Sequence, residues 1–282
     1  MTAVPSTLPA AATAQAHPQA IDRGSALRAA ILVPLIMGWS GLSYLTWLVG
    51  RILTTGSAAR QLRWRHRFLK GWSRGVARLF GMRITITGQP PAAPFFLVSN
   101  HLSYMDIILL YTCLDCVFIA KQDMRRWPAI GFLAHAMSTI WVNRESRRDA
   151  VRVLHEIDRA VGSGDGVVLF PEGTTSAGDG MLPLKAALLD WAARREYPVH
   201  CAVIRYQTAA PAPPAHLAVS WWGDMPFGPH AVALARLPGF DAEVTFLPSP
   251  VRAAERAALA EMARAQMLDH FVPMVAPERL TS

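Results

Sequence analysis

The pair in this sequence best suited to acid–base chemistry is His101 and Asp106, which have four residues between them. The histidine follows an apolar run, 95–98, that is typical of a buried strand, so its imidazole should lie at a strand end. An aspartate five residues further on can hold the ring in one tautomer, and the ring can then remove a proton from a hydroxyl. For a histidine taken alone, a helix cap or a place in the core is the favoured explanation, and a His-x4-Asp pair is too short to be diagnostic.

A second polar cluster follows another apolar run and consists of Glu172, Gly173, Thr174, Thr175 and Ser176. The glycine can turn the chain and let another group approach its backbone closely. The hydroxyls and the acidic side chain could bind a polar headgroup or take part in an anion site. An ordinary strand-to-loop turn explains the same residues, so this cluster also needs support from the rest of the chain.

The elements that must position these residues alternate between short apolar strands and helical segments. We expect strands over 83–87, 95–99, 117–120, 139–143, 167–170, 199–206, 216–221 and 243–247. We expect helices over 105–114, 128–136, 147–162, 183–195 and 253–271. This alternation predicts an α/β domain over residues 82–275, with a mixed, largely parallel sheet flanked by helices.

An uncharged run ahead of this domain, residues 29–50, is long enough to cross a hydrocarbon core of about 30 Å as a helix. We predict a membrane anchor helix over 29–53, preceded by a disordered tail over 1–28 that is rich in Ala, Pro, Thr and Gln. A cleaved signal peptide would have a shorter apolar run nearer the start of the chain. Pro34 leaves open a helix that enters the membrane only part of the way.

The segment 58–81 combines positive charge with an apolar face. Its basic residues recur at spacings of three and four, at Arg60, Arg63, Arg67, Lys70, Arg74 and Arg78. Leucine, tryptophan and valine alternate with them at helical spacing, which predicts a basic amphipathic helix on an anionic membrane surface. Because this positive charge directly follows the apolar run, the C-terminal domain should lie on the cytoplasmic side.

The composition agrees with membrane association, since 52% of the 282 residues are hydrophobic and only 17% are charged. The net charge of +8 favours anionic partners, among them lipid headgroups, phosphorylated metabolites and nucleic acid. Three cysteines, Cys113, Cys116 and Cys201, give no disulfide framework and are typical of a reducing compartment. The first two have the spacing of half a zinc site, but no second pair follows, so we expect no metal site.

Taken together, Asn-His-x4-Asp at 100–106 and Phe-Pro-Glu-Gly-Thr at 170–174 resemble the first and third motifs of the glycerolipid acyltransferases, the family of 1-acylglycerol-3-phosphate O-acyltransferases. Residues 138–144 are similar to the second motif, in which a strand delivers an arginine to the acceptor site. Residues 197–203 stand where the hydrophobic fourth motif belongs, and 118–121 are similar to the segment whose lysine contacts the acceptor phosphate.

This resemblance implies an O-acyltransferase that moves a fatty acyl group from acyl-CoA or acyl-carrier protein to the hydroxyl of a lysolipid. His101 would be its general base and Asp106 the residue that orients the base. The substrate-binding residues would be Lys121, Arg144, Glu172, Gly173, Thr174 and Thr175. The resemblance implies no cofactor besides the acyl donor as co-substrate, no nucleic acid partner, and a location on a bacterial inner membrane.

Thr175 departs from the family pattern at a position that bears on the acceptor. The third motif of phosphatidate-forming members continues Gly-Thr-Arg-Ser, and here Thr175 stands in place of the arginine. A threonine cannot neutralise a phosphate, so a lyso-aminolipid such as lyso-ornithine lipid becomes an alternative to 1-acylglycerol-3-phosphate. Residues 221–225 and 227–230 are also similar to the bacterial branch that uses such an acceptor.

Two other classes of function compete with this hypothesis. A membrane-tethered basic module that binds anionic lipid or nucleic acid would use the arginines of 58–81, but it would not need His101 beside Asp106. A metal hydrolase built on His101, Asp106 and Glu172 would need a second histidine at ligand spacing, which the sequence does not supply.

Overall fold

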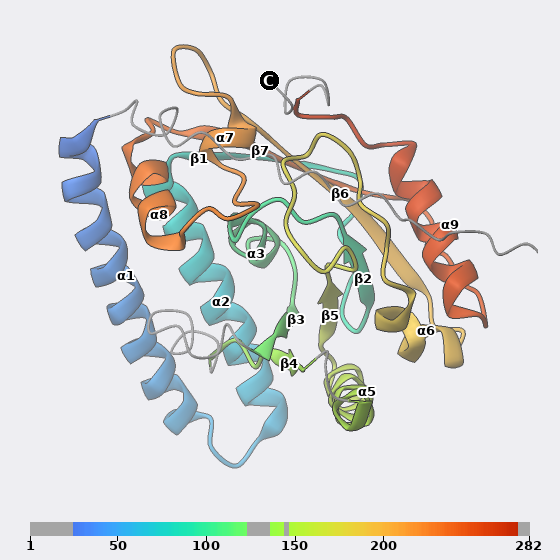
Figure 1. Cartoon of the computed structure of the whole chain (residues 1–282). Coiled ribbons are helices and arrows are strands. Elements are labelled where there is room, and N and C mark those ends of the chain that lie inside the picture. Colours follow the sequence, from blue (N-terminus) through green and yellow to red (C-terminus); the bar gives the residue numbers. More distant parts are fainter. Residues whose placement is uncertain (1–24, 123–135, 144–146, 276–282) are drawn as a thin grey trace, which may run out of the picture.

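The computed structural model of the protein describes residues 25–122, 136–143 and 147–275. They form a seven-stranded sheet with the order β1-β7-β6-β2-β5-β3-β4 (Figure 1). The strands are β1 (Met82–Thr87), β2 (Phe96–Ser99), β3 (Cys116–Lys121), β4 (Ile140–Val142), β5 (Gly166–Leu169), β6 (Val199–Gln207) and β7 (Phe240–Phe246). The paired strands are parallel except for β6 and β7, which confirms the predicted mixed, largely parallel sheet.

Helices cover both faces of this sheet. They are α1 (Ala26–Leu53), α2 (Ala58–Phe80), α3 (Met105–Tyr111), α5 (Arg147–Gly162), the 3-10 turn η3 (Ala186–Leu189), α6 (Asp190–Arg194), α7 (Ala215–Ala218), α8 (Phe227–Arg236) and α9 (Arg256–Leu268). Successive residues of β2 belong to two different cores: Leu97 to one shared with α2, α3 and α8, and Phe96 and Val98 to one shared with α5, α6 and α9. The central strand is therefore buried on both faces, as its continuous apolar sequence predicts.

The helices α1 and α2 lie side by side as an antiparallel hairpin (Figure 1). Indole N–H groups connect them: Trp39 donates to the Trp72 carbonyl oxygen (3.0 Å) and Trp64 to that of Trp47 (3.2 Å). Each of these two rings lies over a glycine of the opposite helix, where an added Cβ would overlap the indole of Trp64 at Gly50 or of Trp39 at Gly75. The predicted anchor and amphipathic helices thus form one packed unit.

The inner face of α2 packs against the sheet, and its outer face carries positive charge. Phe68, Leu69 and Trp72 are buried in the core. The exposed arginines are Arg60, Arg63, Arg67, Arg74 and Arg78. The helix begins after Ser57, whose hydroxyl accepts from the Arg60 N–H, and ends at Gly81 in the left-handed conformation (φ 71°) that glycine adopts without strain.

The outer face of α1 is a continuous apolar surface. Its exposed side chains include Leu27, Ile31, Leu35, Leu42, Leu45, Val49 and Ile52. By length and composition alone, α1 could cross a membrane. It begins at Ala26 after the N-cap Ser25, so residues 26–28 of the predicted disordered tail are helical. Residues 1–24 of that predicted tail lie outside the described residues.

The structure corrects the predicted elements at three places. Residues 216–221 are not a strand: Ala215–Ala218 form the single turn α7 after Pro214, whose fixed φ suits a helix start. The helix α8 was not predicted; Pro229 lies in its first turn, where the missing N–H removes no intrahelical hydrogen bond. The helix predicted over 183–195 is instead the turn η3 followed by the short α6. The helix predicted over 128–136 lies outside the described residues except for Ala136.

Candidate active site

The carboxyl ends of the adjacent parallel strands β2, β5, β3 and β4 meet along one edge of the sheet. His101 follows β2, Glu172 and its neighbours follow β5, and Lys121 ends β3. Arg144 comes after β4 in sequence but lies outside the described residues. The site residues that the structure describes therefore gather where open α/β sheets place their ligand sites.

The imidazole of His101 is held by the carboxylate of Asp106. Nδ1 of the histidine lies 2.7 Å from Oδ2 of the aspartate. The same oxygen accepts the backbone N–H groups of Leu102 (2.8 Å) and Ser103 (3.1 Å), as an ionised carboxylate does. Nδ1 consequently carries the proton, and Nε2 is the nitrogen left to act as a base. The side chain of His101 is 20% exposed whereas that of Asp106 is 0% exposed, so only the imidazole of this pair reaches solvent.

The first and third motifs are in direct contact at this site. The His101 ring stacks on the Phe170 ring, with centroids 3.9 Å apart and planes 8° apart. The backbone N–H of Ser176 donates to the His101 carbonyl oxygen (2.9 Å). The loop after β5 thus fixes both the ring and the backbone of the histidine.

Two further side chains, Tyr206 of β6 and Asn100 just after β2, hold the His101–Asp106 pair in place through hydrogen bonds. The hydroxyl of Tyr206 donates to Asp106 Oδ1 (2.7 Å), and both residues are buried. The amide of Asn100 bridges to the backbone of Ile204, donating to its carbonyl oxygen (2.9 Å) and accepting its N–H (2.7 Å). Sequence reasoning missed Tyr206, because its contact with Asp106 depends on the pairing of β2 with β6, which are far apart in the chain.

A buried histidine on α8 supports the loop that carries the pair. Nε2 of His230 lies 2.9 Å from the Ser220 carbonyl oxygen, which can only accept, so Nε2 holds the proton. Nδ1 therefore accepts from the Tyr104 hydroxyl (3.1 Å). Burial lowers the pKa of His230 to about 4, so the ring stays neutral at ordinary pH. The helix that the sequence did not predict is thus tied to residues between His101 and Asp106.

Glu172 lies beside the pair but faces the protein interior. The residue is 2% exposed, and both carboxyl oxygens are buried without a hydrogen bond to a described residue. Burial raises the pKa of Glu172 to about 8. The backbone groups of His101 and Leu182 lie nearby and work against this increase in pKa, but neither forms a hydrogen bond of normal geometry with the carboxyl. The carboxyl is mostly protonated at neutral pH.

The polar groups nearest the surface come from the rest of this loop and from β3. Gly173 has φ 74°, a left-handed conformation that favours glycine. Thr174 is exposed, Thr175 is half-buried, and Lys121 is exposed at the end of its strand. Among the residues that the structure describes, no group of three or more His, Cys, Asp and Glu side chains could hold a metal ion.

Comparison with family models matches residues 83–205 to the family described as Acyltransferase. The lyso-ornithine lipid O-acyltransferase of Brucella abortus is 39% identical over 194 residues, which cover 65% of this chain and 73% of that protein. The enzyme of the same description from Rhizobium meliloti is 33% identical, with 62% of this chain and 64% of that protein covered. The 1-acyl-sn-glycerol-3-phosphate acyltransferase of Neisseria meningitidis is 32% identical, with 50% and 56% covered.

Among solved structures, the 1-acyl-sn-glycerophosphate acyltransferase of Thermotoga maritima has a similar fold, with a TM-score of 0.61. The match covers 87% of this chain and 93% of that one at 18% sequence identity. At this identity the likeness concerns the fold alone.

Proposed function

Since this chain is an enzyme of the acyltransferase family, we propose that it transfers a fatty acyl group from acyl-carrier protein or acyl-CoA to the hydroxyl of a lysolipid. The observation that supports this proposal most directly is the contact between His101 and Asp106, which leaves Nε2 of a partly exposed ring to act as a base. The base would take the proton of the acceptor hydroxyl as its oxygen attacks the thioester carbonyl. The thiolate then leaves without further activation.

The acceptor that we propose is a lyso-aminolipid such as lyso-ornithine lipid. Thr175 supports this choice, because an uncharged, half-buried side chain stands where phosphatidate-forming members carry an arginine. The two lyso-ornithine lipid enzymes above also match a larger share of this chain than the Neisseria meningitidis enzyme does. Lys121 at the same edge of the sheet supports 1-acylglycerol-3-phosphate as the second candidate.

The remaining candidate residues have proposed roles in binding. Gly173, Thr174 and Thr175 would contact the acceptor, and Lys121 and Arg144 would supply positive charge. Glu172 would act on the acceptor only if the buried carboxyl became accessible on binding. The apolar outer face of α1 supports membrane association, and the exposed arginines of α2 support the cytoplasmic face of a bacterial inner membrane.

Replacement of the base tests the reaction. We expect His101→Ala to lower the rate of acyl transfer by about a hundredfold to ten-thousandfold, the usual share of general-base catalysis. Purified full-length protein would be assayed with labelled acyl-carrier protein and acyl-CoA, and circular dichroism would confirm that the variant folds. A folded His101→Ala variant with wild-type activity would contradict the mechanism.

Replacement of Thr175 tests the acceptor separately. We expect wild-type protein to prefer lyso-ornithine lipid in a panel of lysolipids. The Thr175→Arg variant should shift the preference toward 1-acylglycerol-3-phosphate by about tenfold, because arginine binds phosphate with charge-assisted hydrogen bonds. If wild-type protein acylates 1-acylglycerol-3-phosphate best, the proposed acceptor is wrong while acyl transfer itself stands.

A further inference from the structure

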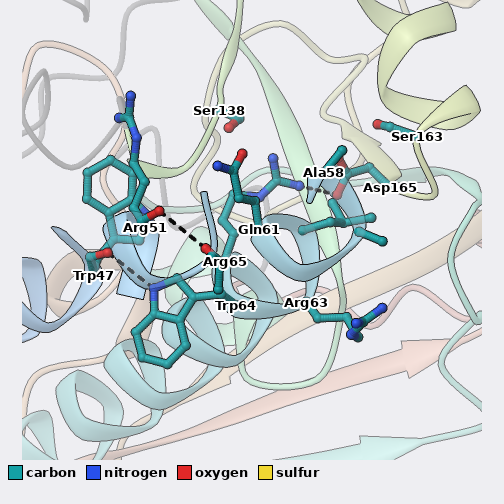
Figure 2. A pocket seen from close by; sticks show the side chains of 13 residues that line it. Trp47, Arg51, Ala58, Gln61, Arg63, Trp64, Arg65, Ser138, Ser163 and Asp165 are labelled. Atoms are coloured by element: carbon teal, nitrogen blue, oxygen red, sulfur yellow. Dashed lines mark hydrogen bonds and ion pairs between the residues drawn. The ribbon is translucent and has the colours of Figure 1, made fainter. Parts of the chain in front are cut away.

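A hollow of about 540 Å³ lies where the end of α1 and the start of α2 meet the sheet (Figure 2). Its wall includes Trp47, Arg51, Gln61 and Trp64 of the hairpin, and Ser138 of the sheet side. A second hollow of about 430 Å³ is almost wholly apolar. It is lined by Leu45, Thr46, Val49, Gly50, Leu53, Thr54 and Trp64. Thr54 and Trp64 line both hollows, so the two adjoin.

These hollows are separate from the candidate active site. Asp165, which lines the larger one, lies just before the first residue of β5. Phe170, which stacks on His101, lies just beyond the last residue of the same strand. The hollows and the base are therefore at opposite edges of the sheet.

The positive charge of the larger hollow comes from its hairpin side. Arg65 forms an ion pair with Asp165, whose side chain is 3% exposed, so this pair contributes little net charge. The guanidinium of Arg51 lies over the Trp47 ring, 5.4 Å from its centroid, and Figure 2 shows both on the side away from Asp165. Arg51 and the exposed Arg63 both line the hollow, together with the Gln61 amide and the rings of Trp47 and Trp64.

The smaller hollow connects the polar part of the larger hollow with the exposed apolar face of α1. The side chains of Leu45, Val49 and Leu53 are all more than half exposed. An arginine with indole rings next to an apolar groove complements a phosphate attached to an acyl chain, and free phosphate would leave the groove empty.

We propose that the turn end of the α1–α2 hairpin binds one anionic glycerophospholipid of the bilayer. Its phosphate lies beside Arg51 and Gln61, and one acyl chain follows Leu45, Val49 and Leu53. This lipid is not the acyl acceptor; it fixes the hairpin at a set depth in the membrane. The inference rests on the membrane association proposed above and does not depend on the identity of the acceptor.

The test uses bromine on lipid chains, which quenches the fluorescence of a tryptophan in contact with it. Full-length protein would be bound completely to phosphatidylcholine vesicles with a constant fraction of phosphatidylglycerol, and the bromine would be carried on either lipid at equal mole fraction. We expect stronger quenching when phosphatidylglycerol carries the bromine. The part of this difference due to Trp64 is obtained from a Trp64→Phe variant.

Two variants that each remove one positive charge distinguish a specific lipid site from general attraction of the protein to an anionic membrane surface. Arg51→Gln should lower the preference for phosphatidylglycerol by about fivefold, the worth of one arginine near an anionic lipid. Arg60→Gln removes the same charge from an exposed position on α2 that lines neither hollow, and it should keep the preference.

Three outcomes would overturn the proposal: equal quenching by both brominated lipids, equal loss in the two variants, or abolition of the preference by inorganic phosphate. Arg51→Gln should keep wild-type acyl transfer with an acceptor dispersed in detergent. Loss of acyl transfer in His101→Ala and loss of lipid preference in Arg51→Gln are therefore separate results.

Discussion

Among the individual residues, Asp106 has the most closely determined environment. One carboxylate oxygen accepts from His101 and two backbone N–H groups, and the other accepts from the Tyr206 hydroxyl. A carboxylate held by four donors cannot rotate, so the imidazole that it holds cannot rotate freely either. We therefore propose that Tyr206 positions the His101 imidazole through Asp106.

Tyr206→Phe removes that hydroxyl and keeps the ring. We expect kcat to fall about tenfold or more, because a hydrogen bond to a charged group contributes about 1.5–3 kcal/mol. The acidic limb of the pH–rate profile should also move to higher pH, since Asp106 without this donor attracts the imidazolium more strongly. Tyr197→Phe, whose hydroxyl lies 3.4 Å from the Pro94 carbonyl oxygen away from the pair, is the matched control. A loss of stability with an unchanged pH profile would show a merely structural role.

Glu172→Gln tests the buried carboxyl through stability. Burial raises the pKa of Glu172 from 4.5 to about 8, so the folded protein keeps a proton that the unfolded chain loses. The stability linked to this group is complete below about pH 4.5 and is lost as the pH rises through about 8. Over this window the free energy of unfolding of wild-type protein should fall by more than that of the variant, by about 3–5 kcal/mol at most.

Denaturant unfolding at several pH values measures this difference. Glu261→Gln, at an exposed position on α9, is the matched control and should follow wild-type protein. Parallel curves for wild-type protein and Glu172→Gln would contradict a raised pKa.

At the scale of elements, the α1–α2 hairpin depends on small residues beneath large rings. An indole ring of the opposite helix packs against each of Gly50 and Gly75. The N–H of that indole donates a hydrogen bond to a backbone carbonyl oxygen. Gly38 and Gly41 of α1 have no neighbour within 4 Å of an added Cβ. The glycines of one helix therefore have different roles, which their sequence context does not distinguish.

Gly50→Ala should separate the two helices locally. We expect a loss of about 1–3 kcal/mol in the free energy of unfolding, because the new methyl group overlaps the Trp64 ring. Gly38→Ala, in the same helix, should leave stability unchanged or raise it by about 1 kcal/mol through helix propensity. Denaturant unfolding of both variants checks this; equal effects would show that the Trp64 contact is not tight.

For the whole molecule, the packing of α1 decides how it can meet a membrane. Arg28 at its start donates to the Ala235 carbonyl oxygen (2.6 Å) and to that of Leu79 (3.2 Å), and Trp47 near its end accepts from Trp64. The helix is thus held along the body of the protein from end to end, and only its outer apolar face remains for lipid. This arrangement favours a helix that lies partly inserted over one that spans the bilayer.

Thr55→Cys in the turn between α1 and α2 tests the partly inserted arrangement. We expect a membrane-impermeant thiol reagent to leave this cysteine unlabelled in intact cells and to label it once the membrane is opened. Ser249→Cys, on the exposed surface of the domain, should behave identically, because both positions lie on one side. Labelling of Thr55→Cys alone in intact cells would show that α1 spans the membrane.

Features that act over a few residues could be predicted from the order of amino acids. The alternation of apolar strands and helices predicted the α/β sheet, the spacing of His101 and Asp106 predicted their contact, and the arginine spacing predicted an amphipathic α2. Periodicity and turn chemistry are local, so these predictions needed no knowledge of the fold. Near prolines these local signals failed: a strand was predicted where α7 forms, and α8 was not predicted at all.

The contacts between residues far apart in the chain became known from the three-dimensional fold. The placing of β2 between β5 and β6 brings Phe170 against His101 and Tyr206 against Asp106, and the packing of α8 brings His230 to Tyr104. The same is true of the hairpin, whose apolar helix lies against α2 and leaves two adjoining hollows at its turn. Strand order and helix packing follow from the burial of apolar surface across the whole chain, and no local spacing records their outcome.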